Sequence, residues 1–320
     1  MAVECALVKR ALVLALCGVL TVYGPAIGQQ SAPSTTIRVG ALPQEVSAEI
    51  FYGLDMGFFS RQGLDVQLTL FSNGSAIAAG VASGSLDVGL SDLISIISAH
   101  ARGVPFVYIA PGLVQSEKAP AFGIVVRGDS KIRGPKDMNG KTFGVNGLNN
   151  ISVIPTRAWI DRNGGDSKTI KWVEIPMPSM QAALAQGTVD ATLPNEPALS
   201  ASVAAGNRAI FMDKNAIAPV YLLSGWVTTR EWIAKNPETA RRFVAAIRET
   251  AEWANQNHAA SAPILSKYTK IPESVITHMH RANFSEAFDP ALIQPVIDAA
   301  AKYGVIPKAF PATEIYYAGR

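Results

Sequence analysis

Hydrophobic and polar positions follow two alternating rhythms along the first two thirds of the chain. Short runs rich in Val, Ile, Leu and Phe predict buried strands. Each run is followed by a stretch whose apolar residues recur every three or four positions, which predicts a helix. Gly follows most of these helices, where it can adopt positive φ without a Cβ clash. The pattern predicts an α/β fold in which mostly parallel sheets are flanked by helices.

The alternation passes through two cycles before the chain becomes mainly helical. The first cycle predicts strands at 36–42, 64–71, 86–90 and 105–112, and helices at 44–56, 72–83 and 91–102, the last with Ser91 as its N-cap. The second cycle predicts strands at 141–147, 169–175, 189–193 and 209–213, and helices at 150–163, 179–186 and 197–206. The remainder predicts one strand at 221–229 and helices at 236–259, 261–269, 272–283 and 290–304. Because these late helices have apolar faces to bury, we expect them to return to the sheet of the first cycle.

One phrase occurs twice, once in each cycle. Residues 77–92 (IAAGVASGSLDVGLSD) and 180–195 (MQAALAQGTVDATLPN) share two Ala, a Gly, an Asp and a Leu at a constant offset. The shared Gly and Asp are Gly84/Gly187 and Asp87/Asp190. A Gly that ends a helix before the next strand is common and would explain one copy. The preceding predicted strands, VQLTLF and IKWVEI, also recur at nearly the same spacing, which this explanation does not cover. We therefore predict two lobes of similar topology, lobe 1 at 35–119 plus 226–320 and lobe 2 at 120–225.

The first 28 residues have the pattern of a secretory signal peptide. Lys9 and Arg10 precede the apolar run 11–22, and small residues stand at 26–28. The run is too short to span ~30 Å of hydrocarbon, so we predict cleavage near Gly28 and a periplasmic location. Cys17 as a lipoprotein cysteine is disfavoured by the bulky residue before it. Both cysteines of the chain lie in this segment, so the mature protein has no disulfide or thiolate nucleophile.

Charge and motif content exclude several functional classes. The formal net charge of +3 is too balanced to indicate a nucleic-acid partner. His278 and His280 are two positions apart on a predicted helix and so face different directions, which disfavours a zinc site. The sequence contains no G-x-S-x-G, HExxH or P-loop motif. We predict a chain that is not an enzyme, with no metal and no cofactor.

Five stretches together resemble a known family. They are GLDMGFFSRQGLDVQL (53–68), GVASGSLDVGLSD (80–92), DMNGKTFGV (137–145), ALAQGTVDATLPNEP (183–197) and NPETARRFVAAI (236–247). In this order and spacing they resemble the nitrate/sulfonate/taurine-binding family of ABC-transporter solute-binding proteins. The resemblance implies a two-lobe periplasmic-binding-protein fold of type II. It also implies ligand capture in the cleft between the lobes and delivery to a membrane permease.

Small polar residues follow the predicted strands, where open α/β sheets bind ligands and helix N-termini offer free N–H groups. The candidate ligand-binding residues are Gln44, Ser72, Asn73, Gly74, Ser75 and Ser91 in the first lobe and Asn146, Asn149, Asn150, Asn195 and Glu196 in the second. Helix capping, turn chemistry or solvated faces are the alternative explanation for each. Asp92 at the cleft rim would repel an anion, so either Asp92 points away or the ligand carries a cation as well. Tyr221 and Trp226 would either stack on a ligand or form buried packing, and Arg157 would be a counter-ion or a solvated helix residue.

These expectations combine into one functional hypothesis with two alternatives. The chain is predicted to be a monomeric periplasmic protein that captures a small organic anion or zwitterion, such as a sulfonate, a taurine-like compound or a carboxylate. It would deliver this ligand to an ABC importer. Many members of the family carry an aromatic residue before Pro197, but this chain has Asn195 and Glu196 there, which disfavours nitrate. The alternatives are an enzyme resembling the thiamine-pyrimidine synthases and a ligand-sensing module for a membrane receptor.

Overall fold

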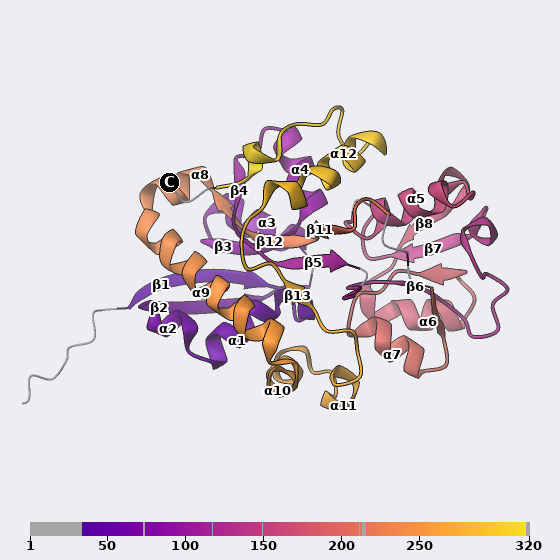
Figure 1. Cartoon of the computed structure of the whole chain (residues 1–320), viewed down its shortest axis with the longest axis horizontal. Helices are drawn as coiled ribbons and strands as arrows, with labels where there is room; N and C mark the ends of the chain where they lie inside the picture. The colour runs from indigo at the N-terminus through magenta and orange to yellow at the C-terminus, as the bar shows by residue number, and fades with distance from the viewer. Residues whose placement is uncertain are drawn as a thin grey trace, which may run out of the picture. The chain divides into compact units, whose positions relative to one another are not determined.

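Two five-stranded sheets form the framework of the protein, and a three-stranded sheet connects them. The computed structural model describes residues 34–72, 74–116, 118–148, 150–210, 212 and 216–317. The predicted signal peptide, Asn73 and Asn149 lie outside the described residues. Within the described part, Figure 1 shows the two large sheets side by side, with helices on both faces of each.

The first large sheet has the strand order β2-β1-β3-β12-β4. Its strands are β1 (Thr35–Ala41), β2 (Leu64–Leu70), β3 (Val88–Asp92), β4 (Phe106–Pro111) and β12 (Ser224–Thr229). β1 pairs in parallel with β2 and β3, whereas β12 runs antiparallel to both of its neighbours. The sheet is therefore mostly parallel, as predicted, with one strand that arrives from the far end of the chain.

The second large sheet has the order β10-β6-β9-β7-β8 and repeats the parallel arrangement of the first. Its strands are β6 (Ile124–Val126), β7 (Thr142–Val145), β8 (Lys171–Glu174), β9 (Ala191–Thr192) and β10 (Arg208–Ile210). β7 lies in parallel between β8 and β9, just as β1 lies between β2 and β3. The connecting sheet consists of β5 (Leu113–Ser116), β11 (Val220–Leu222) and β13 (Asn283–Phe284). Every predicted strand has a counterpart, but β5, β6 and β13 were not predicted.

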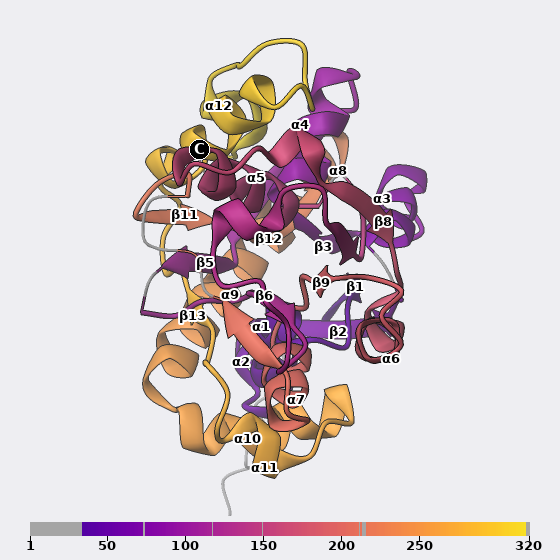
Figure 2. The same ribbon diagram turned by 90° about the vertical axis from the view of Figure 1, so that its right-hand side faces the viewer.

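The helices cover the sheets in the expected places. They are α1 (Ala48–Asp55), α2 (Phe58–Arg61), α3 (Gly74–Ser83), α4 (Leu93–Ala101), α5 (Val153–Arg162), α6 (Met180–Ala185), α7 (Ala198–Ala204), α8 (Arg230–Lys235), α9 (Pro237–Gln256), α10 (His258–Thr269), α11 (Glu273–Ile276) and α12 (Gln294–Lys302). The long helix α9 packs against α1, α2 and β4, so the late helices do return to the first sheet. In the turned view of Figure 2, α5 lies on one side of the second sheet and α6 and α7 on the other.

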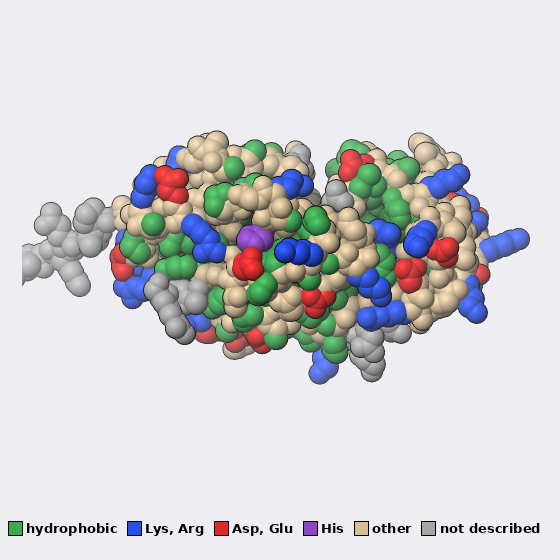
Figure 3. All heavy atoms as spheres, turned by 90° about the horizontal axis from the view of Figure 1, so that it is seen from above, with side chains coloured by type: hydrophobic (Ala, Val, Ile, Leu, Met, Phe, Trp, Pro, Cys, Tyr) green, Lys and Arg blue, Asp and Glu red, His purple; other side chains and the backbone are tan. Residues whose placement is uncertain are grey.

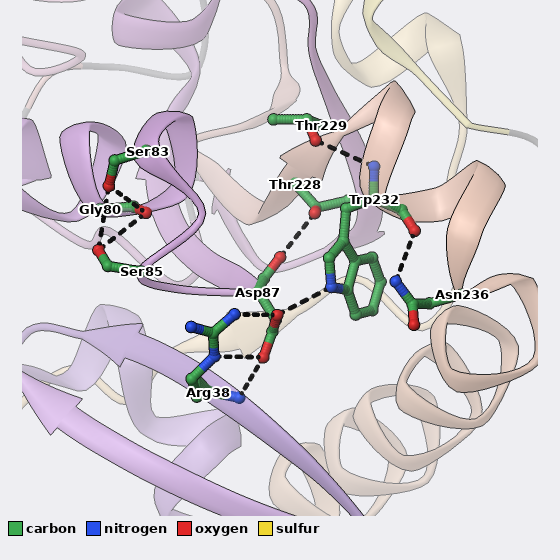
Figure 4. Close-up of polar contacts among 9 residues, drawn as sticks. All are labelled: Arg38, Gly80, Ser83, Ser85, Asp87, Thr228, Thr229, Trp232 and Asn236. Atoms are coloured by element: carbon green, nitrogen blue, oxygen red, sulfur yellow. Dashed lines mark hydrogen bonds and ion pairs between the residues drawn. The ribbon is translucent and has the colours of Figure 1, made fainter.

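The repeated phrase builds the same turn in both sheets. Gly84 and Gly187 end their helices with φ of 73° and 70°, a conformation that glycine adopts without strain. Oδ2 of Asp87 then accepts the backbone N–H of Arg38 in β1 at 2.8 Å, and Oδ2 of Asp190 accepts that of Thr142 in β7 at 2.9 Å. Figure 4 shows the first of these turns. The two aspartates thus fasten corresponding strands, which explains why the phrase recurs.

Three sequence expectations are wrong, each because a long-range contact decides the local structure. Ser91 is not the N-cap of α4, since pairing with β12 extends β3 through Asp92. Asp92 is the cap, and its carboxylate accepts the N–H of Ser95 at 3.1 Å. The expected strand 221–229 is divided at Leu223, where the chain passes from the connecting sheet to the first large sheet. The expected helix 272–283 stops at Ile276, because the chain leaves it to form β13 against β5.

Candidate functional site

In the first sheet, the loops that follow β1 and β2 lie next to each other. Phe71, just beyond β2, donates its N–H to the carbonyl of Ala41 at the end of β1 at 2.9 Å. Gln44 follows β1 and is half-buried, whereas Ser72 follows β2 and is exposed, as is Ser75 in the first turn of α3. Gly74 begins α3. The structure therefore brings together the candidate residues of the first two loops at one edge of the sheet.

The second sheet presents a matching pair of loops after β7 and β9. Leu193, just beyond β9, donates its N–H to the carbonyl of Gly144 in β7 at 3.0 Å. Asn146 follows β7 and is exposed, and Asn195 follows β9 and is half-buried. The carboxylate of Glu174, at the end of the neighbouring β8, accepts the N–H of Leu148 at 2.9 Å. This edge of the sheet thus carries amides together with one carboxylate.

Asn150 organises the loop that leads from β7 into α5. Its side-chain oxygen accepts both the backbone N–H and the hydroxyl of Ser152, at 2.9 and 3.1 Å. These bonds use the amide oxygen, so the group that Asn150 can present to a ligand is its amide N–H. The turn interpretation from sequence is confirmed for this residue, and it leaves a donor for ligand binding.

The loops after β1 and β9 belong to different sheets, yet both contact the segment that carries His280 and Arg281. Gln44 is followed by Glu45, and Asn195 is followed by Glu196. Burial raises the pKa of Glu45 to about 7, and the negative charge of Glu196 is among the other causes that raise it. Arg281 donates to the carboxylate of Glu45, and the backbone N–H of the neighbouring His280 donates to the carboxylate of Glu196, so both loops contact the same segment. The loops that carry Gln44 and Asn195 therefore converge.

Arg281 lies beside this point of convergence and was not predicted from the sequence. Its Nε donates to Oε1 of Glu45 at 2.8 Å, and its Nη2 donates to the hydroxyls of Tyr52 and Ser261 at 2.9 and 2.8 Å. The side chains of Arg281 and Glu45 are only 9% and 5% exposed. The buried ion pair therefore connects the residues just before α1 with the segment between α11 and β13.

Glu196 is committed mainly to its own helix. Its two oxygens accept the N–H and the hydroxyl of Ser200 in α7, at 3.0 and 2.8 Å. Burial raises the pKa of Glu196, although the hydrogen bonds from Ser200 and then the positive charge and backbone N–H of His280 oppose the rise. These contacts match the alternative of a carboxylate that stabilises a helix N-terminus. They also link the second sheet to the segment that carries His280.

Ser91 is buried in the first large sheet, and Asp92 at the end of β3 is half-buried. Ser91 is 2% exposed and lies opposite Gly225 of β12. Asp92 binds both the N–H and the hydroxyl of Ser95, and its pKa is raised because burial outweighs these bonds. The carboxylate of Asp92 is therefore engaged by the first turn of α4.

The aromatic and basic candidates have structural contacts. Trp226 and Tyr221 are fully buried, so the packing interpretation is correct for both. The guanidinium of Arg157 lies over the ring of Tyr303, 4.9 Å from its centroid, rather than on a solvated face. Sequence reasoning missed Glu45 and Arg281 because their pairing joins residues 236 positions apart. The one local signal was Glu45 directly after Gln44 in the first loop.

Two classes of site are not found in the described residues. No group of three or more His, Cys, Asp or Glu side chains is placed there to hold a metal ion. Among the helices described, none is both long and apolar enough to cross a membrane.

Comparisons with known proteins agree with this architecture. The family model described as NMT1/THI5 like matches residues 44–261. The alkanesulfonate-binding protein SsuA from Xanthomonas axonopodis pv. citri superposes with a TM-score of 0.74 at 16% identity, covering 89% of this chain and 99% of SsuA. The resemblance drawn from the sequence, and with it the two-lobe periplasmic-binding-protein fold, is confirmed.

Two curated relatives differ from each other in activity. A 4-amino-5-hydroxymethyl-2-methylpyrimidine phosphate synthase of Saccharomyces cerevisiae is 23% identical over 236 residues, 70% of this chain and 67% of the synthase. A formylaminopyrimidine-binding protein of Halalkalibacterium halodurans is 23% identical over 152 residues, 47% of this chain and 44% of that protein. The relatives thus include both an enzyme and a binding protein.

Proposed function

Because the chain belongs to the NMT1/THI5-like family, we propose that it is a periplasmic solute-binding protein that captures a small organic zwitterion or anion between its two large sheets. The observation that carries the proposal is the convergence of the loops after β1 and β9 on one segment: Glu45, next to Gln44, accepts Nε of Arg281, and Glu196, next to Asn195, accepts the backbone N–H of His280. Ligands of open α/β sheets bind beyond the carboxyl ends of strands, which is where these loops lie.

The polarity of the loops favours a ligand that carries both charges. The first turn of α3, with Gly74 and Ser75, offers a helix N-terminus that attracts a carboxylate or sulfonate. In the second large sheet, the loops after β7 and β8 carry the carboxylate of Glu174 and the amides of Asn146 and Asn150. These groups suit an ammonium or amino group of the ligand. A bare anion such as nitrate would be attracted by the N-terminus of α3 but repelled by the carboxylate of Glu174. A sulfonate or carboxylate with an amino group fits both.

Binding would work by closure about the connecting sheet. β5 leads from the first large sheet toward the second and β11 leads back, and the two pair antiparallel, with Tyr221 opposite Gln115. A ligand that hydrogen-bonds to both large sheets stabilises the arrangement in which they are close, to the extent that it binds this arrangement more tightly. The closed form would then be presented to an ABC importer in the membrane. Lobe boundaries near residues 119 and 225 belong to this proposal.

The enzyme alternative rests on the synthase relative, and the sensing alternative rests on the shared closure mechanism. Against an enzyme, the chain has no cysteine after Cys17, and we find no combination of nucleophile, base and orienting group at the converging loops. Sensing and transport would use the same closed form, so they differ only in the membrane partner that recognises it.

A thermal-shift screen of the purified protein tests the proposal. The panel contains sulfonates, taurine, aromatic and aliphatic carboxylates, amino-acid-like zwitterions, nitrate and pyrimidines. A ligand present at 100 times its Kd should add about 2.7 kcal/mol of stability, which is several degrees in Tm.

Matched variants locate the site. Asn150→Ala and Ser75→Ala should abolish the shift. Asn207→Ala and Ser83→Ala, at sites outside the polar loops that follow β1, β2, β7 and β9, should preserve it. A shift that survives both Asn150→Ala and Ser75→Ala, or no shift with any ligand, would contradict the proposal. Turnover of a pyrimidine precursor would instead support the enzyme.

A further inference from the structure

A short segment between α11 and β13 contacts both large sheets. We call this segment, residues 280–284, the strap. The backbone N–H of His280 donates to the carboxylate of Glu196, which follows β9 of the second large sheet. The guanidinium of Arg281 donates to the carboxylate of Glu45, which follows β1 of the first. Two consecutive residues of the strap therefore bind carboxylates that belong to different sheets.

The strap is fixed to the part of the molecule that carries the first large sheet. Besides Arg281, the backbone N–H of Ala282 donates to Glu45. Phe284 donates its N–H to Oδ1 of Asn255 in α9 at 2.9 Å, and Nδ2 of Asn255 donates to the carbonyl of Phe284 at 2.9 Å. Because α9 packs against β2 and β4, the strap moves with the first sheet.

The carboxylate that receives His280 is fixed to the part that carries the second large sheet. Glu196 is 4% exposed. Its backbone N–H donates to the carbonyl of Ala121, shortly before β6, at 3.1 Å. Its carboxylate also accepts the N–H and hydroxyl of Ser200 in α7. A movement of one large sheet relative to the other therefore acts directly on the bond between His280 and Glu196.

The strap lies to one side of the strands along which the chain crosses between the large sheets. The chain crosses at β5 and returns at β11, and the connecting sheet has the order β11-β5-β13. Since the strap runs into β13, it flanks the crossing strands on the side away from β11. Figure 3 views the molecule from above and shows a notch in its outline between the parts that carry the two large sheets. A rotation of the sheets about the crossing strands must change the distances away from that axis, including the one between the strap and Glu196.

We propose that the strap is a third link between the two large sheets, and that it limits how far they separate in the absence of a ligand. Separation would remove the N–H of His280 from Glu196 and leave that buried carboxylate with the donors of Ser200. Because the loss of a donor to a buried carboxylate is unfavourable, the link favours the arrangement in which the sheets are close.

The link has a consequence for affinity, which rests on the proposed function. A ligand that binds between the large sheets binds the arrangement in which they are close. The apparent affinity then scales with the fraction of molecules in that arrangement. A fall of this fraction from about one half to about one tenth would weaken the affinity about fivefold.

Double electron–electron resonance on the full chain tests the link without any ligand. Spin labels at Ala82→Cys in α3 and Ala185→Cys in α6 occupy exposed, corresponding positions of the repeated phrase. Cys5→Ser and Cys17→Ser remove the other thiols. We expect Glu196→Ala to shift the distances between the labels to longer values by more than about 2 Å, the scale of a domain rearrangement.

Two further variants show whether the strap is responsible. Asn255→Ala releases Phe284 from α9 at the other end of the strap, and it should lengthen the distances as Glu196→Ala does. Ser200→Ala is the matched control, because it removes a hydroxyl that donates to Glu196 but leaves the contact with His280. The distances in Ser200→Ala should equal those of the parent chain.

Each outcome supports or overturns the link. Parent distances in Glu196→Ala or Asn255→Ala, or equal lengthening in Ser200→Ala, would overturn it. If Glu196→Ala fails to fold, as judged by its thermal transition, the other two variants decide. A ligand panel without any hit would contradict the proposed function alone, because the distances are measured without ligand. Weaker binding in Glu196→Ala at unchanged distances would assign Glu196 to the ligand site and overturn the link.

Discussion

The indole N–H of Trp226 donates to Oε2 of Glu49 at 2.8 Å, joining two side chains that are 177 residues apart and 0% exposed. Glu49 lies in the first turn of α1 and Trp226 in β12 at the centre of the first sheet. Oε1 of Glu49 is buried and has no partner among the described residues. Burial raises the pKa of Glu49 well above its usual range, which favours the neutral form of this carboxyl in the folded protein.

Replacement of Glu49 by Gln should change how stability depends on pH. The raised pKa means that the folded state binds the proton more tightly than the unfolded state. Stability from this group is present below pH about 4.5 and is lost as pH rises toward the folded pKa, by up to about 1.4 kcal/mol per pH unit. Glu49→Gln keeps the shape and removes the titration. Urea unfolding at pH 5 and pH 8 should show a smaller decrease for Glu49→Gln than for the wild type, and an equal decrease would refute the buried neutral carboxyl.

The buried pair of Arg281 and Glu45 should be far more sensitive than an exposed pair. Arg281→Met leaves Glu45 without its cation and deprives Tyr52 of a partner, so we expect a loss of about 3–5 kcal/mol. The control is Arg241→Met, because Arg241 and its partner are 75% and 57% exposed and such pairs contribute about 0–1 kcal/mol. Denaturant unfolding measures both. Similar losses in the two variants would show that Arg281 is not buried as described.

The two glycines of the repeated turn should resist substitution mainly for a backbone reason, because an added Cβ would meet open space at Gly84 and only Nη1 of Arg127, at 3.3 Å, at Gly187. Gly84 and Gly187 have positive φ, and an L-residue in that region costs about 1–2 kcal/mol. Gly84→Ala and Gly187→Ala should each lower the unfolding free energy by this amount. Gly134→Ala is the control, since Gly134 has an extended backbone and open space around it. Thermal unfolding would contradict the account if all three variants were equally stable.

The two aspartates of the repeat should differ in their importance. Asp87 accepts the N–H and guanidinium of Arg38 and the indole N–H of Trp232, whereas Asp190 accepts the N–H of Thr142. We expect Asp87→Ala to cost about 1.5–3 kcal/mol and Asp190→Ala about 0.5–1.5 kcal/mol.

The pH dependence separates Asp87 further. Burial acts to raise its pKa, but the hydrogen bonds and charge of Arg38 outweigh burial, and the pKa is lowered. Its contribution is therefore present above pH about 3.8 and lost as pH falls through the folded pKa, so wild type and Asp87→Ala should converge in acid. A gap that is constant down to pH 2 would argue against the ion pair.

The local pattern of the sequence was sufficient for most of the fold. Hydrophobic periodicity predicted the parallel strands of both large sheets, and glycine and capping residues predicted the helix ends at Gly84 and Gly187 and the start of α9 at Pro237. These signals depend only on residues within one or two turns of the chain. The repeat of Gly84 and Asp87 at Gly187 and Asp190 indicated a duplicated architecture before any contact was known. The polar loops after the strands were likewise readable from residue type.

Contacts between distant segments decided the rest. Pairing with β12 extended β3 past Ser91 and made Asp92 the helix cap, and pairing with β5 ended the expected helix at Ile276. The pairing of Arg281 with Glu45 placed a buried charge beside the converging loops. The sequence by itself determined which segments form strands and helices, because local sterics and periodicity act over a few residues. Only the tertiary structure decided which of these segments meet, because the free energy of burying apolar surface and pairing charges depends on partners that lie hundreds of residues away.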